Sequence, residues 1–423
     1  MTGEHRHRSL RRTVQWIGPG FVTGASDDDP SGIGTYAVAG ATFGFATLWT
    51  ALVTFPLMAT VQFICAKIGM VTGQGLAGVL RKHYSIWILY PAILALVVAN
   101  TINAGADIGA IAAAMNLLVS IPAPVFVIPM SLLILAIQIW GSYRRIAGFF
   151  KWLTLSLLAY VGSAFFARPD WAEVLRGTFA PALQFNARFL GILVAIFGTT
   201  ISPYLFFWQA SQEVEEDIAK GKKTVAARRG ATKRELKHAN WDVNLGMFFS
   251  NLVMYFIILA TAATLYKSGK SHIQSATDAA VALEPFVGKF ATTLFALGLV
   301  GAGMLTVPVL TGSSAYAMAE TFGWRFGLDE KFHRAPGFYG LITISTLIAM
   351  FLNFTRINPI NALVWAAVLN GFLAPPLLVL VMIISRNRTI MGKRVNGTLV
   401  NVLGWFAAGL MLFAAIALVI TST

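Results

Sequence analysis

Residues 27–32 read Asp-Asp-Asp-Pro-Ser-Gly and lie in the middle of the first hydrophobic segment of the chain. A carboxylate near the centre of a bilayer costs at least ~2.5 to 3.5 kcal/mol on insertion scales, and here three follow one another. Pro30 lacks a backbone donor and Gly32 favours irregular backbone, so a continuous helix is disfavoured. Irregular backbone at membrane depth is tolerated only where it is buried in protein or lines a watery cavity. The stretch therefore predicts a discontinuous helix that carries an acidic site, and a cation is the natural occupant of such a site.

The composition indicates a polytopic helical membrane protein. Of the 423 residues, 57% are hydrophobic and 12% are charged, which excludes an ordinary soluble globular protein. The net charge of +14 is expected to lie in cytoplasmic loops, so we predict no nucleic-acid partner. The single cysteine, Cys65, excludes an intramolecular disulfide framework. The basic N-terminus is followed by acids without a small-residue cleavage site, which predicts a first span and no removable signal peptide.

Eleven hydrophobic stretches are long enough to cross a bilayer. They cover residues 14–42, 45–67, 86–118, 124–142, 146–167, 188–211, 241–266, 280–321, 336–355, 359–385 and 398–421. With the N-terminus inside, 25 of the 32 Lys and Arg residues are cytoplasmic and seven are outside, as the positive-inside rule requires. The inside set includes Arg144, Arg145, the run Lys220 to Lys237 and Arg386 to Arg394; the outside set is Arg168, Arg176, Arg188, Lys267, Lys270, Lys289 and Arg356. We expect a multi-pass protein of a bacterial inner (plasma) membrane, with a cytoplasmic N-terminus and an external C-terminus.

The sixth span resembles the first, which predicts an inverted repeat. Gly18 is followed twelve residues later by Pro30, and Gly191 is followed twelve residues later by Pro203. Paired interrupted segments in corresponding halves are the best sequence pointer to a transporter site. The predicted organisation is a cytoplasmic tail at 1–13, a first five-span repeat at 14–167, a second, inverted five-span repeat at 188–386, and an eleventh span with a short external tail at 397–423.

The two breaks are expected to supply oxygen ligands. Freed backbone carbonyls and the negative end of a half-helix attract cations, and Asp29 adds a formal charge. No Cys, Met or His lies within either break, so the ligand set is hard and suits magnesium, calcium or manganese. Magnesium often keeps several waters, so a partly hydrated ion fits a site with few protein ligands. The candidate metal-binding residues are Asp28, Asp29, Ser31, Gly32, Thr199, Thr200 and Ser202.

The other polar residues inside the predicted spans each have two possible roles, one in ion binding and one structural. Successive helical side chains are about 100° apart, so three consecutive aspartates cannot all reach one ion. Asp29 is the predicted direct ligand, with Asp28 or Asp27 acting through water or in a structural role. Asp107, in the third span, either lines the ion route or pairs with a polar neighbour. Asn370, in the tenth span, offers a further oxygen or an interhelical hydrogen bond.

These segments resemble the NRAMP family of divalent-metal transporters over most of the eleven spans. Gly18-Pro19-Gly20-Phe21 leading to Asp29-Pro30-Ser31-Gly32 is similar to the start of the family's first span and its Asp-Pro-Gly-Asn motif. Residues 198–204, Gly-Thr-Thr-Ile-Ser-Pro-Tyr, resemble the sixth-span segment Ala-Thr-Ile-Met-Pro-His that follows a glycine. Residues 107–118 resemble the third span, with Asp107 in place of the usual Glu. The resemblance implies an all-α fold of the LeuT type, with spans 1–5 and 6–10 as inverted repeats, helices 1 and 6 broken, and an eleventh span appended.

The departures from the family pattern bear on the transported ion. Gly32 stands where the family has a metal-binding Asn, and Ser202 stands where it has a Met. The loss of a thioether removes a preference for softer transition metals. Tyr204 and Gln209 replace two histidines, the side chains best suited to carry protons near neutral pH, and so belong to the ion path or its surroundings. This pattern resembles the NRAMP-related magnesium transporters, a branch thought to move magnesium and manganese without proton coupling, although some divergent relatives handle trivalent aluminium.

The main functional hypothesis is a secondary carrier that imports divalent cations, chiefly magnesium, without proton coupling. A negative-inside potential contributes ~2.3 kcal/mol per charge per 100 mV, twice for a divalent ion. The alternatives are a proton-coupled manganese or iron importer, an organic-solute symporter on the same fold, and an ion channel. We expect no enzyme, because metalloprotease, nucleophile-elbow and phosphate-loop motifs are missing from the sequence. We predict no cofactor, divalent ions and the lipid bilayer as the partners, and a monomer.

Overall fold

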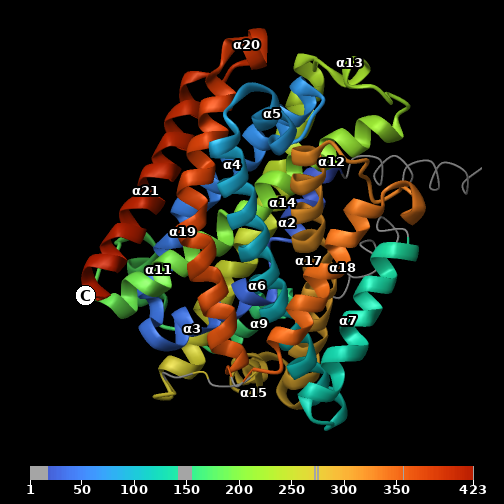
Figure 1. Cartoon of the computed structure of the whole chain (residues 1–423). Helices are drawn as coiled ribbons and strands as arrows, with labels where there is room; N and C mark the ends of the chain where they lie inside the picture. The colour runs from blue at the N-terminus through green and yellow to red at the C-terminus, as the bar shows by residue number, and fades with distance from the viewer. Residues whose placement is uncertain (1–17, 142–154, 271–272, 274–275, 356, 423) are drawn as a thin grey trace, which may run out of the picture.

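The computed structural model describes residues 18–141, 155–270, 273, 276–355 and 357–422, and the regular elements of this part of the chain are all helices (Figure 1). Several predicted features lie outside the described residues: the tail at 1–13, the starts of the first and fifth spans (14–17 and 146–154), and Arg144, Arg145 and Arg356.

The first hydrophobic segment is broken, as predicted. Helix α2 covers Pro19–Ala25 and is capped at its C-terminal end by Ser26, whose N–H bonds back to the last turn. Helix α3 covers Pro30–Phe43 and begins with the extended residue Asp29 as its N-cap. Proline is favoured at the first position of a helix because its missing N–H would have no intrahelical partner. Pro30 therefore starts the second half-helix, and residues 26–29 form the connection between the halves.

The sixth segment is broken in the same way. Helix α11 covers Ala187–Thr200, and helix α12 covers Pro203–Ala219. Ile201 ends the first half with non-helical angles, and the extended Ser202 precedes the proline that starts the second half. The predicted proline pair thus marks two helix breaks of the same design.

Nine further helices complete the crossings. They are α4 (Trp49–Thr72), α6 (Ile86–Val119), α7 (Ala123–Trp140), α9 (Ala159–Phe166), α14 (Lys233–Thr261), α17 (Ala291–Phe322), α18 (Pro336–Leu352), α19 (Pro359–Arg386) and α21 (Thr398–Ser422). In the described residues, eight stretches are long and apolar enough to cross a membrane; they correspond to the predicted spans two, three, four, six, seven, eight, ten and eleven. The first span is too short in each half, and the fifth and ninth are represented by the shorter apolar helices at Ser156–Phe166 and Pro336–Leu352.

The eighth span differs at its start from the predicted residue 280. Short helical turns, including α15 (Ala276–Ala280) and α16 (Glu284–Val287), precede the continuous helix, which begins at Ala291. Gly288 explains the interruption, because its φ of +53° lies in the left-handed half of conformational space, which a helix interior does not use. Four short helices also lie between spans: α5 (Leu76–His83), α10 (Trp171–Phe179), α13 (Val225–Arg228) and α20 (Arg388–Met391).

The helix contacts repeat between the two halves. Helix α3 packs against α14 just as α12 packs against α4, and α6 packs against α7 just as α17 packs against α18. These are the contacts that an inverted five-span repeat produces when each helix is exchanged with its counterpart. The most extensive single contact joins α6 to α17, the third span of each half.

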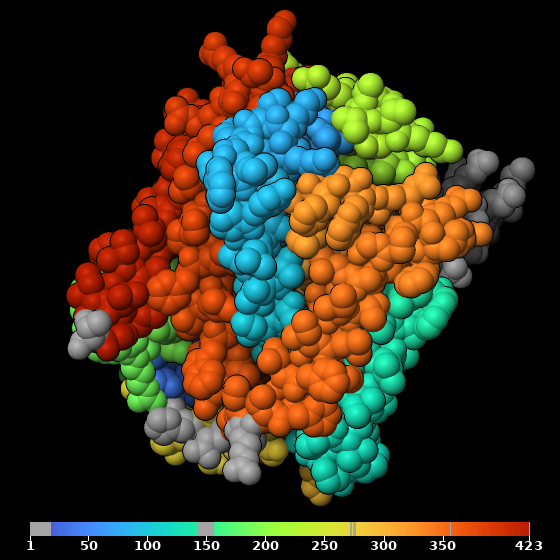
Figure 2. Space-filling view, viewed as in Figure 1, coloured from blue at the N-terminus to red at the C-terminus, as the bar shows by residue number. Residues whose placement is uncertain are grey.

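The short connecting helices are sorted between the two ends of the molecule. Helices α5, α13 and α20, which belong to loops predicted to be cytoplasmic, lie together at one end, and α15 lies at the other (Figure 1). Helices α7 and α21 form the flanks of the molecule (Figure 2). Both flanks expose apolar side chains suited to lipid contact, among them Ile128 and Leu132 of α7 and Phe406 and Phe413 of α21.

Candidate functional site

The carboxylate of Asp29 is the centre of the candidate site and accepts four hydrogen bonds. Its Oδ1 accepts from the backbone N–H of Gly32 at 2.6 Å and from Oγ1 of Thr199 at 3.2 Å. Its Oδ2 accepts from Oγ of Ser31 at 2.7 Å and from Nδ2 of Asn103 at 3.1 Å. The donors come from α3, α6 and α11, so both broken helices and the third span meet at one carboxylate.

Local backbone explains why this carboxylate is held in place. An N-cap side chain accepts from the N–H groups that the first helical turn leaves unpaired, and Asp29 does so for α3. The positive end of the α3 dipole also favours a negative charge there. Asp29 is 1% exposed. The carboxylate is therefore buried and oriented by hydrogen bonds from hydroxyl, amide and backbone N–H donors.

Asp27 and Asp28 point to a different place. Oγ of Ser250, on α14, lies 2.6 Å from Oδ2 of Asp27 and 3.1 Å from Oδ1 of Asp28. A serine hydroxyl carries one proton, so it cannot donate fully to both carboxylates at once. In the described part of the chain, no group of three or more His, Cys, Asp or Glu side chains is arranged to hold a metal ion. The aspartates thus separate into Asp29 on one side and the Asp27–Asp28 pair on the other.

The second break presents fewer free groups. The hydroxyl of Thr200 donates to the carbonyl of Ile196 at 2.8 Å, within its own helix. The hydroxyl of Ser202 lies 2.8 Å from the carbonyl of Gly198 and 2.6 Å from that of Thr199. Of the three predicted hydroxyls here, the one on Thr199 reaches Asp29, whereas those of Thr200 and Ser202 face the backbone. Their role as metal ligands stays a prediction.

Tyr204 and Gln209, which stand in place of the family's histidines, are both buried. The hydroxyl of Tyr204 donates to the carbonyl of Ser26 at 3.1 Å and so joins α12 to the end of α2. The amide of Gln209 donates to Glu213, one turn along α12, at 2.9 Å. Tyr204 therefore borders the first break, while Gln209 belongs to a pair further along the helix.

Asp107 and Asn370 are buried, and in the described part of the chain neither has a polar side-chain partner. The carboxylate of Asp107 faces the backbone N–H of Ser31, but neither of its oxygens has a partner at full hydrogen-bond geometry in the described residues. Both polar atoms of the Asn370 amide likewise lack a partner within the described residues. An unpaired buried polar group costs about 1–3 kcal/mol. Among the described residues, neither the interhelical hydrogen bond considered for Asn370 nor the side-chain pairing considered for Asp107 is formed, and the alternative role of each, as an ion ligand or on the ion route, stays a prediction.

Gly32 is tightly enclosed. A Cβ added here would lie 2.8 Å from Oγ1 of Thr199, 3.0 Å from Oδ1 of Asp29 and 3.3 Å from Cε2 of Tyr36. A larger residue would displace the groups that hold the carboxylate. The glycine is thus required by close approach at the site itself, whereas its predicted role as a metal ligand is untested.

Three residues that the sequence did not single out contribute to the site. Asn103 holds Asp29, Ser250 joins Asp27 to Asp28, and Asp242 of α14 accepts from the N–H groups of Gly18, Gly20 and Phe21. Asp242 is a carboxylate at the start of a predicted span, so the cost of membrane carboxylates could have flagged it. A lone Asn or Ser in an apolar helix carries no comparable signal.

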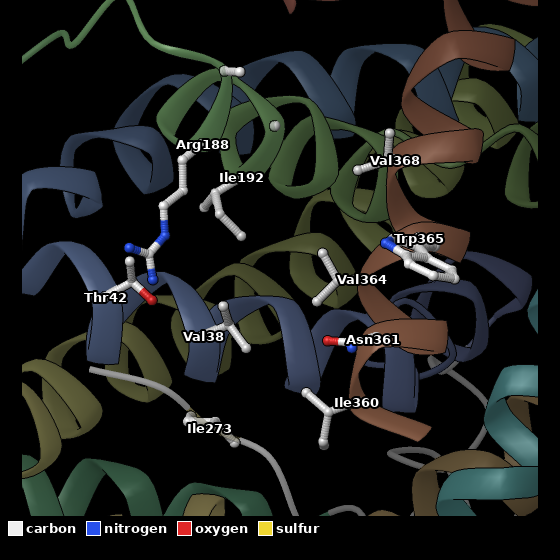
Figure 3. A pocket seen from close by; sticks show the side chains of 12 residues that line it. Val38, Thr42, Arg188, Ile192, Ile273, Ile360, Asn361, Val364, Trp365 and Val368 are labelled. Atoms are coloured by element: carbon white, nitrogen blue, oxygen red, sulfur yellow. The ribbon is translucent and has the colours of Figure 1, made fainter. Parts of the chain in front are cut away.

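A cavity of about 330 Å³ opens between α3, α11 and α19, away from the aspartates. Figure 3 shows Val38 and Thr42 of α3, Arg188 and Ile192 of α11, and Trp365 of α19 around it. Beyond it, α11 and α19 pack backbone to backbone, since a Cβ on Gly198 would lie 2.2 Å from the carbonyl of Ala367. The cavity therefore lies beside α3 and α11, and its lining does not include the carboxylates of Asp27, Asp28 and Asp29, which are buried.

Comparison with known proteins identifies relatives along almost the whole chain. The sequence model of the family described as "Natural resistance-associated macrophage protein-like" (Nramp) matches residues 20–421. The divalent metal cation transporter MntH of Klebsiella pneumoniae subsp. pneumoniae is 26% identical over 397 residues, which cover 92% of this chain and 90% of that protein. The MntH of Bacillus subtilis is 27% identical over 427 residues, covering 98% and 93%.

Solved structures show the same architecture. The manganese transporter of Eremococcus coleocola, in complex with an aromatic bis-isothiourea substituted compound, has a TM-score of 0.74 at 20% identity and covers 96% of this chain and 85% of its own. Mhp1, a nucleobase-cation-symport-1 family transporter in a closed conformation, has a TM-score of 0.58 at 16% identity, with 96% and 93% covered. These likenesses confirm the predicted all-α, LeuT-type fold with its two broken helices. Together with the family match over residues 20–421, they show that this chain is a membrane protein of the NRAMP family.

Proposed function

We propose that this protein is a secondary transporter that imports partly hydrated divalent metal cations, chiefly magnesium and also manganese, by alternating access. The observation that carries the proposal is the buried Asp29 carboxylate at the point where α3, α6 and α11 meet. Family membership supports transport of divalent metals, since its relatives from Klebsiella and Bacillus are divalent metal cation transporters. No enzymatic activity and no resident cofactor are part of the proposal.

The donor set favours a hard cation that keeps part of its water. Around Asp29 the neighbouring side-chain ligands are hydroxyls and an amide, from Ser31, Thr199 and Asn103. Ser202 offers an oxygen where the family pattern has a thioether, and its hydroxyl is turned onto the backbone. Magnesium takes oxygen ligands and dehydrates reluctantly, so one carboxylate with polar neighbours suits it better than a full protein cage.

Transport without proton coupling is the second part of the proposal. The phenol of Tyr204 and the amide of Gln209 occupy the positions of the family's histidines, and both are engaged with neighbouring groups. Neither side chain exchanges protons near neutral pH as an imidazole does. The membrane potential supplies ~2.3 kcal/mol per charge per 100 mV, which drives a divalent ion inward without a second ion.

A proton-coupled manganese importer is the second candidate, and two observations favour it. The structural relative from Eremococcus is a manganese transporter. The buried carboxylates of Asp27 and Asp107 each retain an oxygen without a hydrogen-bond partner among the described groups, so either is chemically able to take up a proton. An organic-solute symporter has no comparable support, because the likeness to Mhp1 shows the fold alone.

The proposed setting is a bacterial inner membrane. The N-terminus is placed in the cytoplasm and the C-terminus outside, with repeats at 14–167 and 188–386 and a monomeric protein. Lys and Arg asymmetry supports this orientation. The shared position of α5, α13 and α20 at one end of the molecule is consistent with it (Figure 1).

The test is uptake into proteoliposomes of purified protein, with magnesium and manganese supplied separately and the internal pH followed. The proposal predicts saturable magnesium flux without acidification. Liposomes without protein serve as the blank. Manganese flux with acidification and no magnesium flux would reject it in favour of the second candidate. In that case Asp107→Asn is expected to abolish acidification, because an amide cannot carry the proton.

A further inference from the structure

Tyr36 lies beside the candidate site although neither the breaks nor the family motif include it. It is on α3, two turns beyond Asp29, and its side chain is completely buried. A long helical side chain lies back over the turn that precedes it. The ring of Tyr36 accordingly covers Gly32, with Cε2 at 3.3 Å from where a glycine Cβ would stand. The phenol is therefore directed along α3 toward the break.

The hydroxyl of Tyr36 lies near three carboxylates and has no partner at full hydrogen-bond geometry among the described residues. It interacts electrostatically with Asp27, Asp28 and Asp29. The hydroxyl of Thr199 is a neighbour, but no group of the described chain meets full hydrogen-bond geometry with the phenol oxygen. Buried hydroxyls are normally paired with protein or ordered water. A buried hydroxyl near three carboxylates is thus left for a ligand or a water.

Two other buried tyrosines differ from Tyr36 in their environment. Tyr204 donates to the carbonyl of Ser26, so its hydroxyl is satisfied by the protein. Tyr160, on α9, is as deeply buried as Tyr36 and also has an unpaired hydroxyl among the described groups, but no carboxylate acts on it. Tyr36 alone of these three combines an unpaired hydroxyl with neighbouring acids. Tyr160 is consequently a matched control for the loss of a buried hydroxyl.

We infer that the Tyr36 hydroxyl hydrogen-bonds a water of the divalent ion held at Asp29, and that Tyr36 is a specificity-determining residue for ions that keep their water. The inference rests on the proposed function and names a further residue of the same site. A water bound to a divalent cation is a strong donor, and a phenol oxygen accepts from it while its proton remains available to a carboxylate. An ion that sheds more water at Asp29 gains less from this contact.

Gly32 and Tyr36 act as a pair in this account. The missing side chain at position 32 makes space beside Asp29, and the edge of the phenol ring borders that space. A side chain at position 32 would meet Thr199 on one side and the ring on the other. The glycine therefore brings the hydroxyl within reach of the ion's water shell, and the tyrosine supplies the polar group.

The experiment compares Tyr36→Phe with Tyr160→Phe in proteoliposome uptake of magnesium and of manganese. Tyr36→Phe removes one hydroxyl and keeps the ring. We expect the KM for magnesium to rise about five- to tenfold, as for the loss of one buried hydrogen bond, the KM for manganese to rise less, and the maximal rate to stay within about twofold. Tyr160→Phe is expected to leave the KM values unchanged.

The other possible outcomes would reject either the inference about Tyr36 or the proposed function. Unchanged KM values in Tyr36→Phe, or a lower maximal rate at unchanged KM, would overturn the inference in favour of a structural role. If the wild-type protein carries manganese and no magnesium, the proposed function fails, and the KM for manganese in Tyr36→Phe then decides the inference. Should Tyr36→Phe fail to fold, Gly32→Ala is measured instead, and an unchanged KM for magnesium in that variant would equally overturn it.

Discussion

The two helix breaks have the same backbone design but very different polar chemistry. In both, an extended residue precedes a proline that starts the second half-helix. At the first break that residue is Asp29, whose carboxylate receives donors from three helices. At the second it is Ser202, whose hydroxyl is directed to the carbonyls of its own half-helix.

This difference shows how an inverted repeat is specialised. The repeat supplies two interrupted helices whose breaks contact one another, and the sequence of each break decides its task. The first break carries the carboxylate that we propose as the cation ligand, while the second contributes Thr199 and otherwise satisfies its own backbone. The ion is therefore expected to bind asymmetrically, close to the first half of the repeat.

Removal of the charge at the first break should have the largest effect. Asp29→Ala is expected to lower magnesium uptake by about 100-fold or more, because loss of one partner of a buried charge pair costs about 3–5 kcal/mol. Uptake into proteoliposomes measures this loss. Asp170→Ala is the control, since Asp170 is exposed and caps the short helix α10. Equal uptake by the two variants would mean that the breaks do not differ in charge-dependent binding.

A larger residue at position 32 should weaken the difference between the two breaks, because it would crowd the groups that hold Asp29 at the first break. Gly32→Asn would place atoms against Thr199 and Asp29, and overpacking of this kind costs about 1–3 kcal/mol. Magnesium uptake is expected to fall about tenfold, with a lower melting temperature of the purified protein. Uptake at the wild-type level would show that the carboxylate does not depend on this close packing.

A thioether at the second break should shift the metal preference. Ser202→Met introduces the soft ligand that the family pattern places there, and soft ligands favour transition metals over magnesium. The ratio of manganese to magnesium uptake is expected to rise about tenfold. Ser202→Ala serves as the control, because it removes the same hydroxyl without adding sulfur. If both variants change the ratio equally, the effect comes from the lost hydroxyl.

The smallest effects are expected when one of two adjacent hydroxyls of the second break, on Thr199 or on Thr200, is removed. Thr199 donates to Asp29, whereas Thr200 donates to the carbonyl of Ile196. Thr199→Val is expected to raise the KM for magnesium about fivefold, as for one net hydrogen bond. Thr200→Val should leave it unchanged. Concentration-dependent uptake measures both values, and a reversed order would contradict the geometry at Asp29.

The sequence predicted the breaks because acids and prolines inside apolar segments have few structural solutions. Asp29-Pro30 and Ser202-Pro203 both lie where the helices are interrupted. Asp27 and Asp28 lie against Ser250, whereas Asp29 faces other donors. Helical side-chain spacing is not the cause, because residues 26–29 form the non-helical connection between α2 and α3, and which aspartate contacts the ion stays a prediction. Acids and prolines inside an apolar segment are visible in consecutive residues, so a single sequence is enough to predict such a break.

The partners of these residues were not predictable in the same way. Asn103 and Ser250 are ordinary polar residues in apolar helices until tertiary packing brings them to the aspartates. The hydroxyl of Thr200 is indistinguishable by sequence from that of Thr199, because their one-residue offset around the helix decides which one faces Asp29. The turns before Ala291 were missed because the segment is mostly apolar, although Glu284-Pro285 and Gly288-Lys289 interrupt it in the sequence.

The most direct test of the central claim is calorimetric titration of magnesium into purified wild-type protein and into Asp29→Asn. The variant keeps the size and most hydrogen-bonding capacity of the side chain but removes its charge. The account predicts saturable binding to the wild type and no measurable binding to Asp29→Asn. Equal affinity of the two proteins would contradict it, because the ion would then be held without the carboxylate at the first helix break.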